Sequence, residues 1–495
     1  MRALVLILVL LAPGFGQELP DTAELERELK RLIQVFAIVS ENAADAVPAD
    51  QLIYGGAIPG MLRQLDPHSA FFNPDQFEQL KEMQTSVTRG FGSIVSVLPG
   101  RVIVLQVMTG SPAERSGLAA GDEIVAVNNI DLSRLDAEQL VQVLGMTRQR
   151  EAQVLVRRPG TARLLPITMT PAEMQSPSVD RAFLAAPGVG YVRATTFDAK
   201  TGREIRDAIE KLGGAKLRGL ILDLRDNPGG ALTAALDTAA QFLPAGTRLL
   251  SARGRGREVE AVDVPAGFEP YMFPLAILIN QTTASASEIV AGALQDQDRA
   301  IVVGEPSFGK GLVQSVFPLS ENTGLALTTA YYYTPSGRSI QKPLRAGELS
   351  GATAVEERPE YKTAAGRTVR GGGGIEPDHV VYPEAPTRFR VVLEASGSFP
   401  QFATEWLGRN RAQASREMPI TPALLDEFQL WLSRRNIRPG IREWTAERVY
   451  VTSRLKQEIL NQSVGVDAGD ELEVERDPVV RRALGLLGGS RGEVF

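Results

Sequence analysis

The first part of the chain carries apolar residues at the spacing of helices. Over residues 21–44 they recur every three or four positions with charged residues between them, which predicts an amphipathic helix. A second helix is predicted over residues 49–65, and it ends before Pro67, which disfavours helical geometry in the residue that precedes it. The apolar face of the first helix consists of Leu25, Leu29, Leu32, Ile33 and Phe36. This face suits either packing or dimerisation, and the pattern does not separate the two.

Residues 85–170 contain short apolar runs, which are interrupted by glycines and prolines. This pattern predicts a small β-rich domain, with helices at 111–117 and 136–144 and a hairpin turn at Pro159–Gly160. The predicted strands lie at Ile94–Val97, Val102–Val107, Glu123–Val127 and Val154–Val156.

Apolar runs and helical patterns alternate over residues 186–383. Helices are predicted at 201–212, 231–242 and 285–294. The predicted strands between and around them are Gly190–Val192, Leu220–Leu224, Leu275–Ile279 and Ile301–Val303. Such alternation favours a largely parallel, buried sheet, and ligands of these sheets bind at the carboxyl ends of the strands. Residues 384–495 are predicted to be mostly helical, and they carry no chemistry that we recognise. Their probable core anchors are Trp406, Trp431 and Trp444.

The composition limits the chemistry that is open to this chain. Its 495 residues predict several domains. The net charge of −6 provides no basic field for nucleic acid. The absence of cysteine excludes disulfides, thiolate catalysis and cysteine zinc sites. Only two histidines are present, so most pairs of a nucleophile and a base are excluded as well.

The N-terminus has the pattern of a signal peptide. Arg2 supplies a positive charge, Ala3–Ala12 is an apolar run, and cleavage is expected after Gly16. The run is too short to span a bilayer, which needs about 20 residues. A buried first helix is the alternative interpretation. We therefore expect export to a periplasmic or other extracytoplasmic location, where membrane association stays open.

A serine and a lysine stand at positions that suit a nucleophile and its base. Ser285 follows a predicted buried strand and begins a helix, and Lys310 lies between two glycines, 25 residues later (310 − 285). A serine needs a base within hydrogen-bond reach, and a lysine serves as one when burial lowers its pKa. Gln314 is placed to accept a hydrogen bond from the lysine amine. The competing interpretation is that Ser285 only caps the helix, together with Glu288.

Backbone amides near Ser285 are candidates for an oxyanion hole. The Ala286 amide begins the helix after Ser285, where N–H groups are free and carry partial positive charge. Gly229 and Gly230 follow the neighbouring predicted strand and allow a tight turn with outward-facing amides. A plain turn between strand and helix is the alternative for these glycines.

A second glycine-containing loop lies at the start of the β-rich segment. It consists of Gly90, Phe91, Gly92 and Ser93, and a predicted strand follows it. Such a loop can direct successive amides at a peptide carboxylate while the strand pairs with the peptide backbone. A glycine-rich hairpin is the alternative.

Several ordered motifs resemble those of the carboxyl-terminal processing proteases, which are tail-specific serine peptidases of the S41 type with a PDZ domain. The resemblance covers roughly residues 50–383. Its motifs are Leu65–Ser69, Gly110–Asp122, Leu222–Gly230, Thr283–Ile289, Phe308–Gln314, Tyr333–Gln341 and Gly374–Asp378. One departure is Phe91, which replaces the aliphatic residue more usual in the carboxylate loop.

The resemblance implies roles for individual residues. Ser285 is similar to the nucleophile of the family, Lys310 to the general base and Gln314 to the residue that orients the lysine. Ala286 and Gly229 or Gly230 are similar to the oxyanion donors, and residues 90–93 to the loop that binds the substrate carboxylate.

The implied fold is a multidomain α+β protein in which a PDZ domain precedes a βαβ-rich peptidase core, with helical regions at both ends. The expected boundaries are 1–17 for the signal peptide, 18–75 for an N-terminal helical region, 76–170 for the PDZ domain, 171–385 for the peptidase core and 386–495 for a C-terminal helical extension.

The expected function is an exported endopeptidase that engages a free protein C-terminus and cleaves upstream of it. No metal or other cofactor is implied, and the expected partners are substrates with free C-termini, an activator or adaptor protein and a second copy of the chain. Two alternatives stay open: a scaffold that captures peptides without cleaving them, and a hydrolase that uses Ser285 with His68 or His379.

Overall fold

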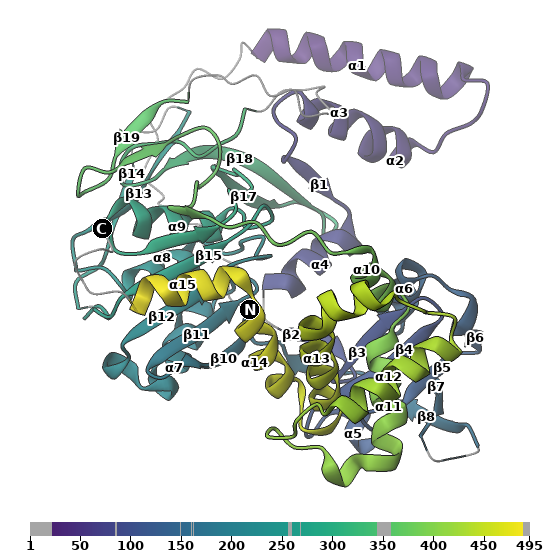
Figure 1. Cartoon of the computed structure of the whole chain (residues 1–495). Helices are drawn as coiled ribbons and strands as arrows, with labels where there is room; N and C mark the ends of the chain where they lie inside the picture. Colours follow the sequence, from purple (N-terminus) through teal and green to yellow (C-terminus); the bar gives the residue numbers. More distant parts are fainter. Residues whose placement is uncertain are drawn as a thin grey trace. The chain divides into compact units, whose positions relative to one another are not determined.

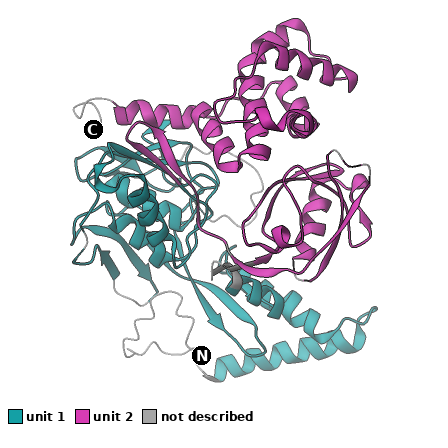
Figure 2. Ribbon diagram, turned by 90° about the horizontal axis from the view of Figure 1, so that it is seen from below, with its two compact units in different colours: residues 1–85, 193–380, 491–495 teal, residues 86–192, 381–490 magenta. Residues whose placement is uncertain are grey.

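The computed structural model describes most of the chain, and the predicted signal peptide, residues 1–17, lies outside the described residues. The described residues are 22–84, 87–148, 150–159, 161, 163–255, 260–267, 269–343 and 358–488. Figure 2 shows two compact units. The first unit comprises residues 1–85, 193–380 and 491–495, and the second comprises residues 86–192 and 381–490. In the described part of the chain, no helix has the length and apolar character needed to cross a membrane.

Helices begin the first unit, as the apolar spacing predicts. Helix α1 spans Thr22–Asn42, which confirms the first predicted helix. The second predicted helix is present but interrupted, because a π-helical turn, η1 (Ile53–Ala57), separates α2 (Ala49–Leu52) from α3 (Ile58–Arg63). Strand β1 (Ala70–Phe72) and helix α4 (Pro74–Gln84) follow.

A parallel sheet forms the core of the first unit (Figure 1). The strands that this unit contributes to the sheet are, in spatial order, β12 (Gly219–Asp223), β15 (Leu275–Ile279), β16 (Ile301–Gly304) and β21 (His379–Val380). The helices are α7 (Thr201–Leu212), η3 (Gly214–Lys216), α8 (Leu232–Ala240) and α9 (Ala286–Asp296). Every residue of β12, β15 and β16 is buried, which explains their continuous apolar sequence. The predicted alternation is confirmed, and the carboxyl ends of β12 and β15 are adjacent.

An antiparallel sheet in the same unit departs from the sequence prediction, which treated residues 186–383 as one alternating pattern. It contains β1 together with β13 (Arg248–Gly254), β14 (Glu260–Asp263), β17 (Leu312–Pro318) and β18 (Gly324–Tyr333). Strands β17 and β18 form a hairpin whose turn includes Glu321 and Asn322, both with positive φ. The prediction missed this sheet because pairing depends on partners far apart in sequence. A smaller hairpin pairs β19 (Glu360–Lys362) with β20 (Thr368–Arg370).

The second unit begins with the β-rich domain that the sequence predicts. Its strands and helices are β2 (Val87–Gly90), β3 (Ser93–Leu98), β4 (Arg101–Val107), α5 (Pro112–Arg115), β5 (Glu123–Val127), β6 (Ile130–Asp131), η2 (Leu132–Arg134), α6 (Ala137–Thr147), β7 (Ala152–Arg157), β8 (Leu165–Met169) and β9 (Ala172–Gln175). The main sheet has the order β3-β4-β5-β7-β8, so β3 is an edge strand. The predicted hairpin joins β7 to β8, while Gly160 itself lies outside the described residues. Strands β10 (Val179–Ala186) and β11 (Val189–Ala194) follow.

The C-terminal extension in the second unit is helical and has a core of its own. Its helices are α10 (Arg388–Ala395), α11 (Ser398–Asn410), η4 (Arg411–Gln413), α12 (Pro422–Arg434), α13 (Ile441–Ser463), α14 (Val466–Arg476) and α15 (Pro478–Gly488). Trp406 and Trp431 are buried in this core, and Trp444 packs against it, as predicted. Trp431 stacks on Phe428 with ring centroids 6.1 Å apart.

Candidate active site

Ser285 occupies a strained turn between β15 and α9. Its φ of 54° and ψ of −114° are rare for a residue with a side chain, and such strain persists only where the surroundings enforce it. The Ser285 N–H donates to Glu288 Oε2 at 2.8 Å, and the Glu288 N–H donates to the Ser285 carbonyl at 2.9 Å. The predicted partnership of Ser285 with Glu288 is therefore present, and it holds the serine backbone at the N-terminus of a buried helix.

Lys310 lies in the loop before β17, and its amine is oriented by Gln314, four residues later in the chain. Lys310 Nζ donates to Gln314 Oε1 at 2.6 Å, the hydrogen bond that the sequence predicts. Burial lowers the pKa of Lys310, while the negative charges of Asp66 and Glu288 act in the opposite direction. Of the apolar residues on either side of Lys310, Leu312 is buried and Phe308 is 47% exposed.

The buried carboxylate of Glu288 joins the serine turn to the lysine loop. Its Oε2 accepts the N–H groups of both Ser285, at 2.8 Å, and Lys310, at 2.9 Å. Its Oε1 accepts the Gly309 N–H at 2.7 Å and the Ser307 hydroxyl. Burial raises the pKa of Glu288, and the four hydrogen bonds oppose that rise. Since all four partners donate, the geometry suits an acceptor-only carboxylate.

Tyr332, from β18, bridges the same two residues through their carbonyl groups. Its hydroxyl lies 2.9 Å from the Lys310 carbonyl oxygen and 3.2 Å from that of Ser285, and it shares one proton between them. The side chain is buried, which raises the pKa of the Tyr332 hydroxyl and keeps it a donor. The amides and carbonyls of Ser285 and Lys310 are thus held by two side chains, which places the two backbones beside each other.

The glycines after β12 lie against the Ser285 turn. A Cβ on Gly229 would lie 2.9 Å from both the Ala286 nitrogen and Ser285 Cβ, so only glycine fits there. The Gly229 N–H is engaged by Asn227 Oδ1 at 2.9 Å. Within the described residues, the N–H groups of Gly230 and Ala286 have no acceptor. Of the three candidate amides that the sequence suggests, these two are therefore the ones free to donate to a ligand.

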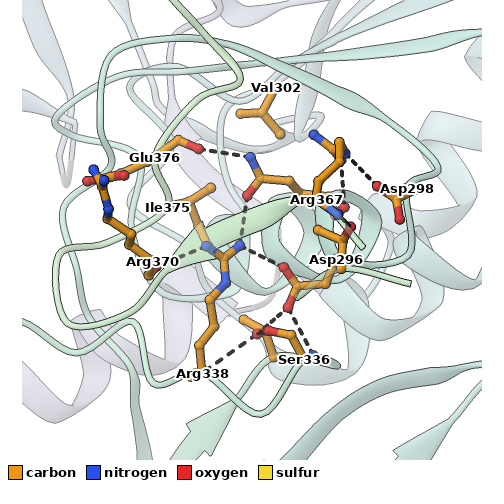
Figure 3. A network of polar contacts seen from close by, with 12 residues as sticks. Asp296, Asp298, Val302, Ser336, Arg338, Arg367, Arg370, Ile375 and Glu376 are labelled. Carbon is orange, nitrogen blue, oxygen red and sulfur yellow. Dashed lines mark hydrogen bonds and ion pairs between the residues drawn. The ribbon is translucent and has the colours of Figure 1, made fainter. Parts of the chain in front are cut away.

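A buried ion pair anchors the far end of α9 (Figure 3). Arg338 is fully buried, and its Nη2 lies 2.8 Å from Asp296 Oδ1 and 2.7 Å from Gln295 Oε1. Its Nη1 donates to the Arg370 carbonyl at 3.0 Å. The helix that begins at Ser285 is therefore fixed at both ends. The hydroxyl of Ser287, on its first turn, donates to the Asn227 carbonyl at 3.1 Å.

The loop at residues 90–93 lies in the second unit, at the start of edge strand β3. The Phe91 carbonyl accepts the N–H of Ala113, and the Gly92 carbonyl accepts the N–H of Met108, both at 2.9 Å. Gly92 has a φ of 75°, and a Cβ there would overlap Ser111. The N–H groups of Phe91 and Gly92 find no acceptor among the described residues, so they are available to a ligand.

Sequence reasoning missed three contributors to this site. Glu288 was interpreted only as a partner in helix capping, Tyr332 was not singled out, and His68 was considered only as an alternative partner of Ser285. The structure places the His68 carbonyl 2.8 Å from Gln314 Nε2, while His379 lies in β21, in register with Val303. Only the motif Leu65–Ser69 gave a signal for the His68 segment, because its position depends on tertiary contacts.

Comparisons with known proteins identify two parts of the chain. Residues 188–346 match the model of peptidase family S41, and residues 103–158 match the model of the PDZ domain. A carboxy-terminal-processing protease of Bartonella bacilliformis is 35% identical over 320 residues, which cover 64% of this chain and 73% of that one. A carboxyl-terminal-processing protease of Synechocystis is 36% identical, with 58% and 68% covered.

Among solved structures, a photosystem II D1 C-terminal processing protease is 27% identical, with 74% of this chain and 94% of that chain covered and a TM-score of 0.39. The two curated relatives combine high identity with coverage of more than two thirds of their own length. The chain therefore belongs to peptidase family S41, as a carboxyl-terminal processing protease with a PDZ domain.

Proposed function

We propose that this chain is an exported serine endopeptidase that binds the C-terminus of a substrate protein and cleaves the chain upstream of it. Ser285 is the nucleophile, Lys310 the general base and Gln314 the residue that orients the lysine. The observation that carries the proposal is the joint clamp of Ser285 and Lys310 by Glu288, together with the hydrogen bond from the lysine amine to Gln314.

In the proposed reaction, neutral Lys310 takes the hydroxyl proton while Ser285 Oγ attacks the peptide carbonyl carbon. The oxyanion that forms is stabilised by the amides of Ala286 and Gly230, at the positive end of α9. Protonated Lys310 then gives its proton to the leaving amine, and the peptide bond breaks to leave an acyl ester on Ser285. Water, activated by the same lysine, hydrolyses the ester.

The PDZ domain supplies the proposed C-terminus recognition. The free amides of Phe91 and Gly92 would bind the substrate carboxylate, and β3 would pair with the substrate as an added strand, because β3 is an edge strand. A charged acceptor strengthens such hydrogen bonds roughly twofold over neutral ones. Loss of the carboxylate charge should therefore weaken substrate binding.

This proposal predicts a difference between two forms of one substrate. An unstructured protein with a free apolar C-terminus should be cleaved, and its C-terminally amidated form should show a KM raised about 10-fold, since charged hydrogen bonds contribute about 1.5–3 kcal/mol. Product formation measured by mass spectrometry at several substrate concentrations gives the comparison. Equal KM values for both forms would reject recognition of the C-terminus. Absence of cleavage of either form would reject an endopeptidase that acts without an activator protein.

We also propose that α1 pairs with a second copy of the chain. Leu25, Leu29, Leu32, Phe36 and Val39 alternate at spacings of four and three, the seam of a two-stranded coiled coil. Leu25 and Leu29 are each 49% exposed and Leu32 is 55% exposed, so this seam is uncovered within its unit. Exposed apolar stripes of this kind mark association surfaces.

The seam predicts a change in assembly when charge is placed in it. A double variant, Leu29→Glu with Leu32→Glu, should sediment as a smaller species than the unmodified protein. Gln34→Glu adds a charge to the same helix outside the seam and serves as the matched control. Sedimentation velocity at one protein concentration measures all three. A wild-type protein that sediments as a monomer, or a control that dissociates equally, would contradict the proposal.

A further inference from the structure

The segment Asp66–Ser69 forms a turn that one carboxylate holds together. Asp66 Oδ1 accepts the N–H groups of His68 and Ser69, each at 2.7 Å, and Asp66 Oδ2 accepts the Ser69 hydroxyl at 2.7 Å. Both Asp66 and Ser69 are buried. Three charge-assisted hydrogen bonds from one buried carboxylate make the turn rigid.

The turn is fixed to the strand pair that carries Gln314. The Thr328 N–H, on β18, donates to the Ser69 hydroxyl at 3.2 Å. Thr328 is the register partner of Gln314 on β17. Strand β1, which begins at Ala70, continues the same sheet by pairing with β18. The turn is thus attached at the level of Gln314, although it lies 246 residues earlier in the chain.

The contact between the turn and Gln314 determines which end of the amide faces the lysine. A backbone carbonyl only accepts hydrogen bonds, and the His68 carbonyl lies 2.8 Å from Gln314 Nε2. Gln314 Oε1 is therefore directed at Lys310 Nζ, 2.6 Å away. In the flipped amide, two oxygens would face each other at His68 and two nitrogens would face each other at Lys310. The His68 carbonyl excludes that arrangement.

We infer that the Asp66–Ser69 turn is a positioning element of the active site, which orients Lys310 through the His68 carbonyl and Gln314. This inference rests on the proposed function, because it assigns the turn a role in the Ser285–Lys310 reaction. The His68 carbonyl, rather than its imidazole, makes the contact. Asp66 has two roles in this arrangement: it holds the turn, and it is one of three charged or titratable groups that face Lys310, together with Glu288 and His68.

The two roles of Asp66 can be separated by two substitutions. Asp66→Asn keeps an oxygen for the two N–H groups but removes the negative charge that raises the pKa of Lys310. Its maximal kcat should be retained within a few-fold, and the acid limb of the kcat profile should move to lower pH. Asp66→Ala removes the three hydrogen bonds that the carboxylate accepts within the turn, so the maximal kcat should fall about 100-fold, the loss typical of small misplacements in active sites, with little change in KM.

Two further variants distinguish this inference from its competitors. His68→Ala keeps the backbone carbonyl and should lose far less kcat than Asp66→Ala, whereas Arg63→Ala, outside the turn, is the control for general effects. Cleavage of an unstructured protein between pH 5 and pH 10 and thermal unfolding are measured for each variant. A normal kcat in Asp66→Ala, an unshifted acid limb in Asp66→Asn, or an equal loss in His68→Ala would overturn the inference. If Lys310→Ala is fully active, the proposed function itself fails, which is a distinct result.

Discussion

Replacement of Ser285 by alanine is expected to lower the rate of peptide cleavage by ~10⁴-fold or more, the scale seen when a catalytic nucleophile is removed. The reason is that no acyl ester can form without the hydroxyl oxygen. The structural cost should be small, because the hydrogen bonds of Ser285 to Glu288 and Tyr332 use its backbone. Single-turnover cleavage of an unstructured protein, with thermal unfolding as the control for folding, measures both effects. Full activity in the purified variant would reject the assignment.

Lys310→Ala should cause a loss of the same order, and the pH dependence of the unmodified enzyme should identify the lysine as the base. Lys310 acts only when it is neutral, so kcat rises with pH as the lysine loses its proton. Burial lowers the pKa of Lys310, and the rise should therefore occur below the pH at which an ordinary lysine titrates. Gln314→Ala should be less damaging than Lys310→Ala. A larger loss in Gln314→Ala would reverse the two roles.

Replacement of Glu288 by alanine is expected to lower kcat by ~10²–10³-fold, because the serine turn and the lysine loop lose the oxygen atom that they share, and small misplacements of reacting groups cost about 10²-fold. The variant should also be destabilised. Four buried donors, on Ser285, Ser307, Gly309 and Lys310, would lose their acceptor, at about 1–3 kcal/mol for each that stays unsatisfied. Denaturant unfolding and steady-state kinetics measure the two losses separately.

Glu288→Gln is the matched control for that prediction. Its remaining oxygen can accept the N–H groups of Ser285 and Lys310, and its NH₂ group can face Ser307, whose hydroxyl is able to accept. The Gly309 N–H and the Ser307 O–H then lack their former acceptor, so kcat should stay within about 10-fold of wild type, the scale of one or two lost hydrogen bonds. An alanine variant as active as the glutamine variant would show that the shared oxygen does not position the two residues.

The strands and helices that frame the candidate site could be predicted from the sequence because they depend on short-range patterns. Strands β12, β15 and β16 are buried on both faces, and their continuous apolar runs indicated this directly. The adjacency of β12 and β15 followed from the alternation of strands and helices, which brings the Gly229–Gly230 loop to Ser285. The spacing of Lys310 and Gln314 indicated their hydrogen bond, since Lys310 lies just before β17 and Gln314 near its start.

The antiparallel sheet and the residues that hold the site could not be predicted in the same way. Strand β1 pairs with β18 more than 250 positions later in the chain (Ala70 with Ala326), and no local pattern specifies such a partner. In the sequence, nothing distinguishes Tyr332 from other residues of a buried strand. Its role depends on the two carbonyl groups that the fold brings to its hydroxyl.

The sequence by itself determined which side chains are available for chemistry, because it contains a serine at a strand-to-helix turn, a lysine between glycines and no cysteine. It also determined the local elements that present them, since helices and strands follow from periodicity. Only the tertiary structure decided how the dyad is held. Glu288, Tyr332 and the Asp66–Ser69 turn act through hydrogen bonds at 2.7–3.2 Å between segments distant in the chain. Hydrogen bonds are short-ranged and directional, so only the packed fold decides which ones form.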